Sequence, residues 1–145
     1  MSKSTPVFSG LNLVVQDMEA TLAFYRKLGL EIPDATVWRT DSGPHHVDIS
    51  MPEGINFDFD SPQLAKSYNG GWDAERGSVV GFSLASRKEV DERYEEMIEA
   101  GYLGLQAPYD AFWGARYAVV EDPDGNHVGL MSPRDPTRMT DPPSI

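Results

Sequence analysis

Apolar and polar residues alternate along some segments of this chain and recur at helical spacing along others. Val7–Val15 alternates with the period of two that is typical of a strand with one buried face. Asp17 can cap a following helix, in which Met18 and Leu22 begin an apolar stripe and Gly29 marks the end. Three further strand-like runs cover residues 36–40, 46–51 and 55–60. The pattern predicts a unit with the order strand, helix, strand, strand, strand.

The same order of patterns begins again in the second half of the chain. Ser78–Ala85 alternates as a strand, Ser86 can cap the next helix, and Gly101 marks the end of that helix. The strands predicted after it cover residues 104–107, 115–120 and 127–131. Between the last two lies Asp122–Asn126, whose sequence DPDGN is typical of a tight turn.

The two units match at an offset of about 70 residues, which indicates an internal repeat of one supersecondary unit. Neither unit alone could bury its sheet, so we predict an α+β fold in which two βαβββ modules form one curved mixed sheet with the helices outside. We expect a single domain over residues 1–135. Within it, the modules cover about 7–62 and 78–133, an exposed loop over 63–77 joins them, and a proline-rich tail follows over 136–145.

Composition limits the classes of function. The 145 residues include no cysteine, which excludes disulfides, thiolate metal sites and a thiol nucleophile. The formal net charge of −11 disfavours nucleic acid as a partner, and no apolar run is long enough to span a membrane. The first residues show no signal-peptide pattern, so we expect a cytoplasmic protein.

Three segments carry a family likeness. The stretch Ala23–Leu30, the run Trp113–Arg116 and the turn Asp122–Asn126, together with the doubled βαβββ unit, resemble the vicinal oxygen chelate superfamily. That superfamily includes glyoxalase I, bleomycin-resistance proteins, fosfomycin-resistance enzymes and extradiol dioxygenases. The resemblance covers about Val7 to Pro133 and implies the glyoxalase-like fold, but the fold alone does not assign a function.

Enzymes of this superfamily hold a metal inside the curved sheet, and the resemblance shows where its ligands would lie here. The four equivalent positions hold Gly10, Asp58, Val79 and Gly129, of which only Asp58 has a donor side chain. We therefore expect no metal and no other cofactor. A displaced site built from His46, Asp48, Asp58 and His127 stays open as an alternative, because strand alternation permits it.

Alternation also predicts which strand residues face the cavity of the curved sheet. These are Phe8, Asn12, Val14, Asn56, Asp58, Asp60, Val79, Gly81, Ser83, His127, Gly129 and Met131. The glycines leave room for an organic ligand, and the acids and amides favour one with amine or amide groups.

Aromatic residues outside the helices suggest the rest of a small-molecule site. The candidate ligand-binding residues are Asn12, Trp38, Asp58, Trp72, Phe112, Trp113, Arg116 and His127. Each also has a structural explanation. Trp113 could plug the end of the sheet, Arg116 could pair with Asp110 or Glu121, and the other two tryptophans could cover a core or a dimer face.

These features favour a metal-free small-molecule binding protein, similar to the bleomycin-resistance members of the superfamily. Such a protein would be a homodimer that holds an aromatic or cationic compound in the sheet cavity or in a groove between subunits. One alternative is an enzyme of the same fold, of lyase, isomerase or dioxygenase type. It would use a rebuilt metal site or metal-free acid–base chemistry by His127 and Asp58. Another alternative is a structural or regulatory dimer without a ligand. The catalytic residues, if any, are not indicated by the sequence.

Overall fold

One mixed sheet of eight strands organises the computed structural model, which describes residues 4–28, 30–51, 54–73, 78–121 and 125–145. From edge to edge the strands follow the order β2, β3, β4, β1, β5, β8, β7, β6. Their bounds are β1 Val7–Val14, β2 Val37–Thr40, β3 Gly43–Ile49, β4 Asn56–Asp60, β5 Ser78–Ser83, β6 Gly104–Asp110, β7 Arg116–Glu121 and β8 His127–Met131.

The strand order is that of two repeated βαβββ modules, as predicted. In each module the first strand pairs in parallel with the last: β1 with β4, and β5 with β8. The modules meet where β1 and β5 run antiparallel, with Leu11 opposite Val80, so both modules of one chain form a continuous sheet. A parallel pair requires a long crossover connection, and each module supplies its helix within that crossover.

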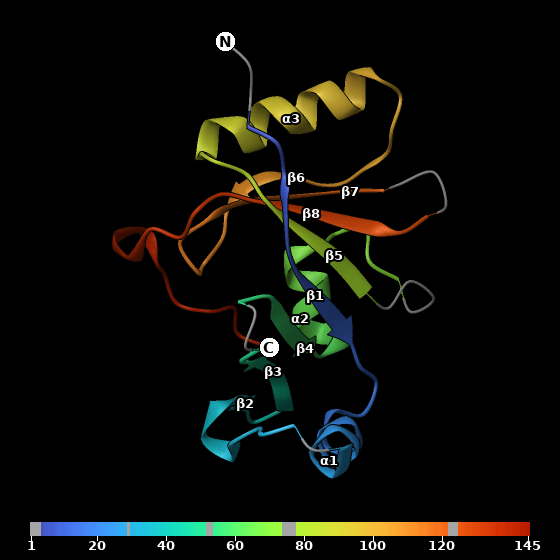
Figure 1. Ribbon diagram of the computed structural model, residues 1–145, viewed down its shortest axis with the longest axis vertical. Helices are drawn as coiled ribbons and strands as arrows, with labels where there is room; N and C mark the ends of the chain where they lie inside the picture. The colour runs from blue at the N-terminus through green and yellow to red at the C-terminus, as the bar shows by residue number, and fades with distance from the viewer. Residues whose placement is uncertain (1–3, 29, 52–53, 74–77, 122–124) are drawn as a thin grey trace.

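Helices α1 (Met18–Leu28) and α3 (Arg87–Glu99) cover one face of the sheet, toward opposite ends of the molecule (Figure 1). Both begin at the predicted caps. The Asp17 and Ser86 side chains each accept a hydrogen bond of 3.1 Å from a backbone amide in the first turn of their helix. Two apolar cores lie beneath them. The core under α1 includes Leu22, Val47 and Phe59, and the core under α3 includes Leu84, Val90 and Leu130.

The segment 63–77 is not simply the exposed joining loop that we predicted, because helix α2 (Pro62–Tyr68) occupies its beginning. The Ser61 hydroxyl accepts a hydrogen bond from the Leu64 amide at 3.1 Å, and Pro62 occupies the first turn, where its missing amide hydrogen is not needed. The buried face of α2 packs on the sheet face opposite α1 and α3. The resulting third core contains Leu64, Ala65, Tyr68, Trp72, Val79, Ala111, Tyr117 and Val119.

The C-terminal arm, residues 132–145, is extended apart from a short 3-10 turn, η2 (Pro136–Arg138). The Thr140 amide donates to the Phe112 carbonyl oxygen at 2.9 Å, and the Thr40 hydroxyl donates to the Ile145 carbonyl oxygen at 2.7 Å. The arm therefore runs from the end of β8 past the loop between β6 and β7 to β2, and the C-terminus lies near β3 in Figure 1.

Some sequence expectations concern positions at the edge of the described residues. Gly101 has a φ of 97° after α3, and Gly125 has a φ of 88° before β8, as a helix end and a tight turn require. Gly29 and residues 122–124, which complete the predicted helix end and turn, lie outside the described residues. Among the described helices, none is long and apolar enough to cross a membrane.

Gly10 of β1 lies close to the backbone of Asn56 on β4. A Cβ atom added there would lie 2.5 Å from the Asn56 carbonyl oxygen and 2.8 Å from the Asn56 Cβ. Real Cβ atoms essentially never come so close to backbone, and a carbonyl in a sheet cannot simply rotate away. Position 10 is therefore closed to any side chain unless the two strands move apart.

We expect Gly10→Ala to lower the free energy of unfolding by about 1–3 kcal/mol, because the added methyl group forces β1 away from β4. Urea denaturation measures the change. The matched control is Gly70→Ala: a Cβ at that position would be 3.4 Å from its nearest neighbour, so its effect should stay within about 1 kcal/mol. Equal stability of the two variants would contradict the close approach.

Candidate functional site

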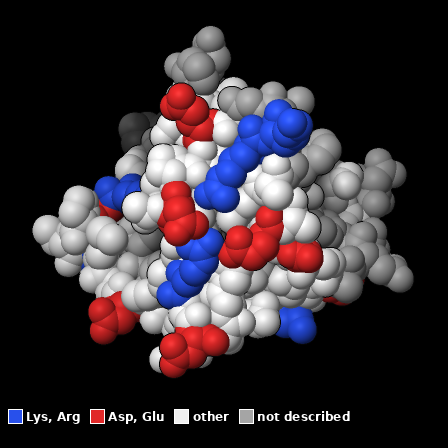
Figure 2. All heavy atoms as spheres, turned by 90° about the horizontal axis from the view of Figure 1, so that it is seen from below, with Lys and Arg blue, Asp and Glu red and all other residues white. Residues whose placement is uncertain are grey.

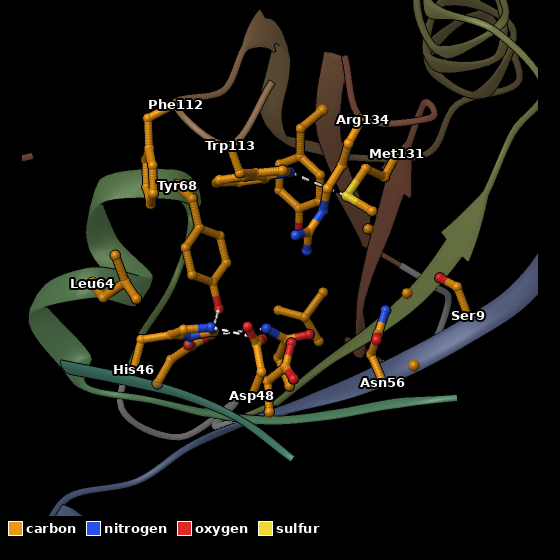
Figure 3. Close-up of a pocket in the computed structure, with 18 of the residues that line it drawn as sticks. Ser9, His46, Asp48, Asn56, Leu64, Tyr68, Phe112, Trp113, Met131 and Arg134 are labelled. Atoms are coloured by element: carbon orange, nitrogen blue, oxygen red, sulfur yellow. Dashed lines mark hydrogen bonds and ion pairs between the residues drawn. The ribbon is translucent and has the colours of Figure 1, made fainter. Parts of the chain in front are cut away.

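A cavity of about 370 Å³ lies on the sheet face that α2 covers, bounded by α2, the loop between β6 and β7, and the C-terminal arm. This volume lies within the range of small-molecule sites. Its polar lining consists of Ser9, Asn12, His46, Asp48, Asn56, Asp58, Asp60 and Arg134. Its aromatic lining consists of Trp38, Tyr68, Phe82, Phe112, Trp113 and Tyr117. Figure 3 shows Phe112 and Trp113 across the cavity from His46 and Asp48.

His46 on β3 joins two carboxylates. Its Nδ1 lies 2.5 Å from Asp60 Oδ1, and its Nε2 lies 2.9 Å from Asp48 Oδ1. Antiparallel pairing sets the first contact, because His46 is directly opposite Asp60 on β4. The other Asp60 oxygen accepts from the Asn12 amide at 2.9 Å and from the Tyr68 hydroxyl at 2.8 Å. The Asp60 carboxylate, which is only 1% exposed, therefore has three donors.

The contacts set the charge of the imidazole. Burial lowers the pKa of His46, but the hydrogen bonds and charges of Asp48 and Asp60 outweigh burial and raise this pKa to about 10. The hydrogen bond from His46 in turn lowers the pKa of Asp48 to about 2. At neutral pH the side chain of His46 is an imidazolium that donates from both nitrogens to ionised acids.

The pKa of Asp58 shifts in the opposite direction to the pKa of Asp48. Burial, together with the negative charge of Asp48 directly opposite it across β3 and β4, raises the pKa of Asp58 to about 8. The carboxyl group is therefore mostly protonated at neutral pH and can donate a hydrogen bond as well as accept one. It presents a neutral acid to the cavity beside the charged His46–Asp48 pair.

The positive and negative charges of the ionised groups that line the cavity offset each other. His46 and Arg134 carry positive charge, and Asp48 and Asp60 carry negative charge. The cavity therefore does not repeat the overall excess of acidic residues. Acidic and basic side chains are also interspersed on the outer face shown in Figure 2, and Arg39 bridges Glu19 and Asp34 at 3.0 Å each. We consequently expect shape and hydrogen bonding, rather than a positive charge on the ligand, to dominate recognition.

Trp113 is the centre of the aromatic wall. Its ring meets Phe112, Tyr117 and Tyr68 edge to face, with ring centroids 5.1, 5.3 and 6.4 Å apart. Its indole nitrogen donates to the Met131 sulfur at 3.2 Å. Trp113 therefore packs against the inner core and also lines the cavity.

The structure brings five of the eight candidate residues to the cavity: Asn12, Trp38, Asp58, Phe112 and Trp113. Among the alternation-based positions, Asn56, Asp60, Val79, Gly81, Gly129 and Met131 also line it. Phe8 does not, because the register between β1 and β5 shifts between Phe8 and Gly10. Phe8 instead packs edge to face on Phe82 with ring centroids 6.0 Å apart.

Three candidates lie elsewhere. Trp72 is buried in the core beside α2, with the Lys66 ammonium 5.6 Å from its ring centroid. Arg116 forms ion pairs with Asp91 at 2.8 Å and with Asp110 at 3.2 Å, which confirms the structural explanation for that residue. His127 is buried, and its Nδ1 lies 2.8 Å from Asn69 Nδ2. The segment after α2, which the sequence analysis took for an exposed loop, supplies that contact.

Tyr68 and Arg134 are two of several lining residues that were not anticipated. Tyr68 belongs to α2, which is too short to show helical periodicity, although Ser61 followed by Pro62 is a recognisable helix start. Arg134 belongs to the arm, where no periodic pattern predicts the direction of a side chain. Its guanidinium extends from the arm into the cavity in Figure 3.

The positions that hold a metal in similar enzymes do not fit one here. Val79 has no donor, position 10 is closed by Asn56, and a Cβ at Gly129 would lie 2.7 Å from the Tyr117 hydroxyl oxygen. Of the displaced set, His46, Asp48 and Asp58 have ligand atoms within 4.8 Å of one another, but His127 faces Asn69 instead. A cation bound there would have to displace a proton from His46, because both of its nitrogens lie within hydrogen-bond distance of a carboxylate.

A family model covers most of this chain. Residues 8–130 match the family described as Glyoxalase/Bleomycin resistance protein/Dioxygenase superfamily. Uncharacterized protein Mb0911c of Mycobacterium bovis is 30% identical over 127 residues, which cover 84% of this chain and 80% of that protein.

Solved structures show the same fold at low identity. Hypothetical protein BH1468 from Bacillus halodurans aligns with a TM-score of 0.64 at 16% identity, covering 91% of this chain and 97% of that one. A glyoxalase/bleomycin resistance protein/dioxygenase superfamily member from Vibrio splendidus aligns with a TM-score of 0.57 at 13% identity, covering 89% of this chain and 100% of that one.

We expect His46→Gln to lower the free energy of unfolding by about 3–5 kcal/mol, because it leaves the buried Asp60 and its neighbour Asp48 without their shared cation. Urea denaturation at neutral pH measures the loss. As a control, Lys88→Gln removes only an exposed pair with Glu92 on α3 and should cost less than about 0.5 kcal/mol. A small effect of His46→Gln would mean that the imidazolium does not hold the two acids.

Stability should fall as the pH rises from about 5 to about 9. The pKa of Asp58 is raised above its ordinary 3.8, and the pKa of His46 above its ordinary 6.5, so both groups hold their protons more tightly when folded. Their stabilising contributions are complete below those ordinary values and are lost as the pH rises through about 8 and about 10. Thermal melts across this range should show a decline of several degrees, at roughly 3 °C per kcal/mol.

The variant Asp58→Asn isolates the carboxyl contribution, since an amide stays neutral at every pH. Its melting temperature should decline less with rising pH than that of the wild type. Asp41→Asn, which changes an exposed acid in the turn between β2 and β3, should keep the wild-type slope. If Asp58→Asn also kept that slope, the raised pKa of Asp58 would be wrong.

Proposed function

The chain belongs to the glyoxalase/bleomycin resistance protein/dioxygenase superfamily, and within it we propose that this protein binds a planar aromatic compound without a metal. The ligand lies in the cavity between the sheet, α2 and the C-terminal arm. One observation carries the proposal: an aromatic wall around Trp113 faces a polar floor around Asp58 across about 370 Å³ of space. Such a combination of apolar surface with few convergent polar groups is what small-molecule sites share.

The floor offers selective hydrogen bonding. Asp60 already accepts hydrogen bonds from His46, Asn12 and Tyr68, so we assign it mainly to holding the floor together. Asp58 and Asn56 line the cavity with a neutral carboxyl and an amide, each able to donate and to accept. A ligand with an amine or amide on a flat ring system fits this floor and the opposite wall.

Residue packing supports the metal-free part of the proposal. Asn56 closes position 10, and Tyr117 fills the space beside Gly129. Neighbouring residues therefore occupy the space that a metal-ligating side chain would need at these two positions. The cavity itself is lined by Gly10, Gly81 and Gly129 and by the aromatic side chains.

A second candidate is a metal-free enzyme, which the Asp48–Asp58 pair favours. A neutral carboxyl beside an ionised one, inside a cavity, is a suitable general acid and base. Mass spectrometry of a cell-extract metabolite pool incubated with the protein separates the two candidates. Conversion of one compound by the wild type, but not by Asp58→Asn, would identify an enzyme, whereas retention of an unchanged compound supports a binding protein.

The variant Trp113→Leu tests the binding site directly. The probe is 6-amino-2-naphthamide, a flat neutral molecule with about 14 non-hydrogen atoms, for which ~0.3 kcal/mol per atom corresponds to a Kd of ~1 mM or tighter. Calorimetric titration should show binding to the wild type and at least a roughly tenfold loss in Trp113→Leu, since an aromatic wall contact contributes ~1.5 kcal/mol or more.

The matched control is Trp72→Leu, which removes a tryptophan from the core outside the cavity. It should lower the melting temperature but leave the Kd of the folded protein unchanged. If the wild type does not bind the probe, or if both variants weaken binding equally, the cavity is not the binding site that we propose.

A further inference from the structure

Arg134 differs from the other arginines of the cavity region and the arm. Arg116 and Arg138 each form an ion pair with an aspartate, and so does Arg87 nearby. Across the part of the chain that the structure describes, Arg134 has neither a carboxylate within 4.0 Å nor a hydrogen-bond partner for its guanidinium. The side chain nevertheless lines the cavity and extends into it (Figure 3).

The backbone on both sides of Arg134 is fixed. The Ser132 amide donates to the Arg116 carbonyl oxygen at 3.0 Å, and the Asp135 amide donates to the Gly114 carbonyl oxygen at 2.9 Å. These bonds hold the start of the arm against β7 and the loop before it, and they fix the position of the Arg134 backbone. The guanidinium is therefore placed at the cavity by the fold and not by a contact of its own.

The acids of the cavity are already engaged. Asp60 and Asp48 share the His46 imidazolium, and Asp58 lies beside Asp48 on the floor. Arg134 acts on Asp48 through its longer-range charge, which helps to lower the pKa of that acid, but it forms no ion pair within 4.0 Å among the described residues. A guanidinium with open donors favours a planar oxyanion, which it can bind through two parallel hydrogen bonds.

We propose that the ligand is an aromatic carboxylic acid, whose carboxylate binds Arg134 at the mouth of the cavity while its ring lies against Trp113. This inference rests on the proposed function and adds the ligand's charge and orientation. The polar end opposite the carboxylate then meets Asp58 and Asn56 on the floor. The proposal gives the ligand a negative charge, whereas the sequence led us to expect an aromatic or cationic compound.

Two probes with one ring system test the charge. 6-Amino-2-naphthoate and 6-amino-2-naphthamide differ only in the group that would face Arg134. We expect the wild type to bind the acid at least about tenfold more tightly than the amide, as a charge-assisted hydrogen bond allows. Arg134→Gln should abolish this preference and change the Kd for the amide by less than about twofold.

Arg138→Gln provides the matched control, because it removes the same charge from the same arm at a residue outside the cavity lining. It should keep the preference for the acid, which excludes a general effect of net charge. If the wild type binds acid and amide equally, the inference is overturned while the proposed function stands. If neither probe binds, both fail. If Arg138→Gln abolishes the preference as fully as Arg134→Gln, the anion site is not at Arg134.

Discussion

A buried carboxylate is costly unless it is paired, and Asp60 is where this fold meets that constraint. Its partners come from three different elements: His46 from β3, Asn12 from β1 and Tyr68 from α2. The same requirement that neutralises the acid therefore joins the two strands on either side of β4 to a helix on the inner face of the sheet. The position of α2, and with it one boundary of the cavity, depends on this network.

The network also determines which acids remain for a ligand. Because His46 contacts both Asp60 and Asp48, these two acids offset its positive charge. Asp58 keeps its proton beside the ionised Asp48. A cavity lined by three acids and two amides is consequently close to electroneutral. Under the proposed function, recognition depends on the aromatic wall and on Arg134, which approach from the opposite side (Figure 3).

Much of this architecture could be predicted from residue patterns, and the exceptions have physical reasons. Alternation placed Asn12 and Asp58 in the cavity because strands β1 and β4 are regular there. It failed for Phe8, where an irregularity shifts the register. His127 does face inward, but Asn69 covers it, and no local pattern predicts a contact made 58 residues away.

The remaining differences arise from short or irregular segments. Helix α2 has only seven residues, so its capping serine and proline were the sole local signals of a helix. Arg116 faces the acids of α3 and β6 rather than the cavity, because two carboxylates there offer partners that the sequence cannot rank. The direction of the Arg134 side chain depends on backbone contacts between the arm and β7, which no periodic pattern in the sequence of the arm predicts.

The internal repeat extends past the strands, because Ser61–Pro62 after β4 has its counterpart in Ser132–Pro133 after β8. The two continuations differ in form, a helix in one case and an extended arm in the other, yet each crosses to the opposite module. Helix α2 packs on Val79 and Tyr117 of the second module, and the arm reaches Thr40 of the first. Each half thus covers the inner face of its twin, so a half separated from the other would lose both its neighbour in the sheet and the segment that shields it from water. Duplication in this chain has produced two mutually dependent halves rather than two independent copies.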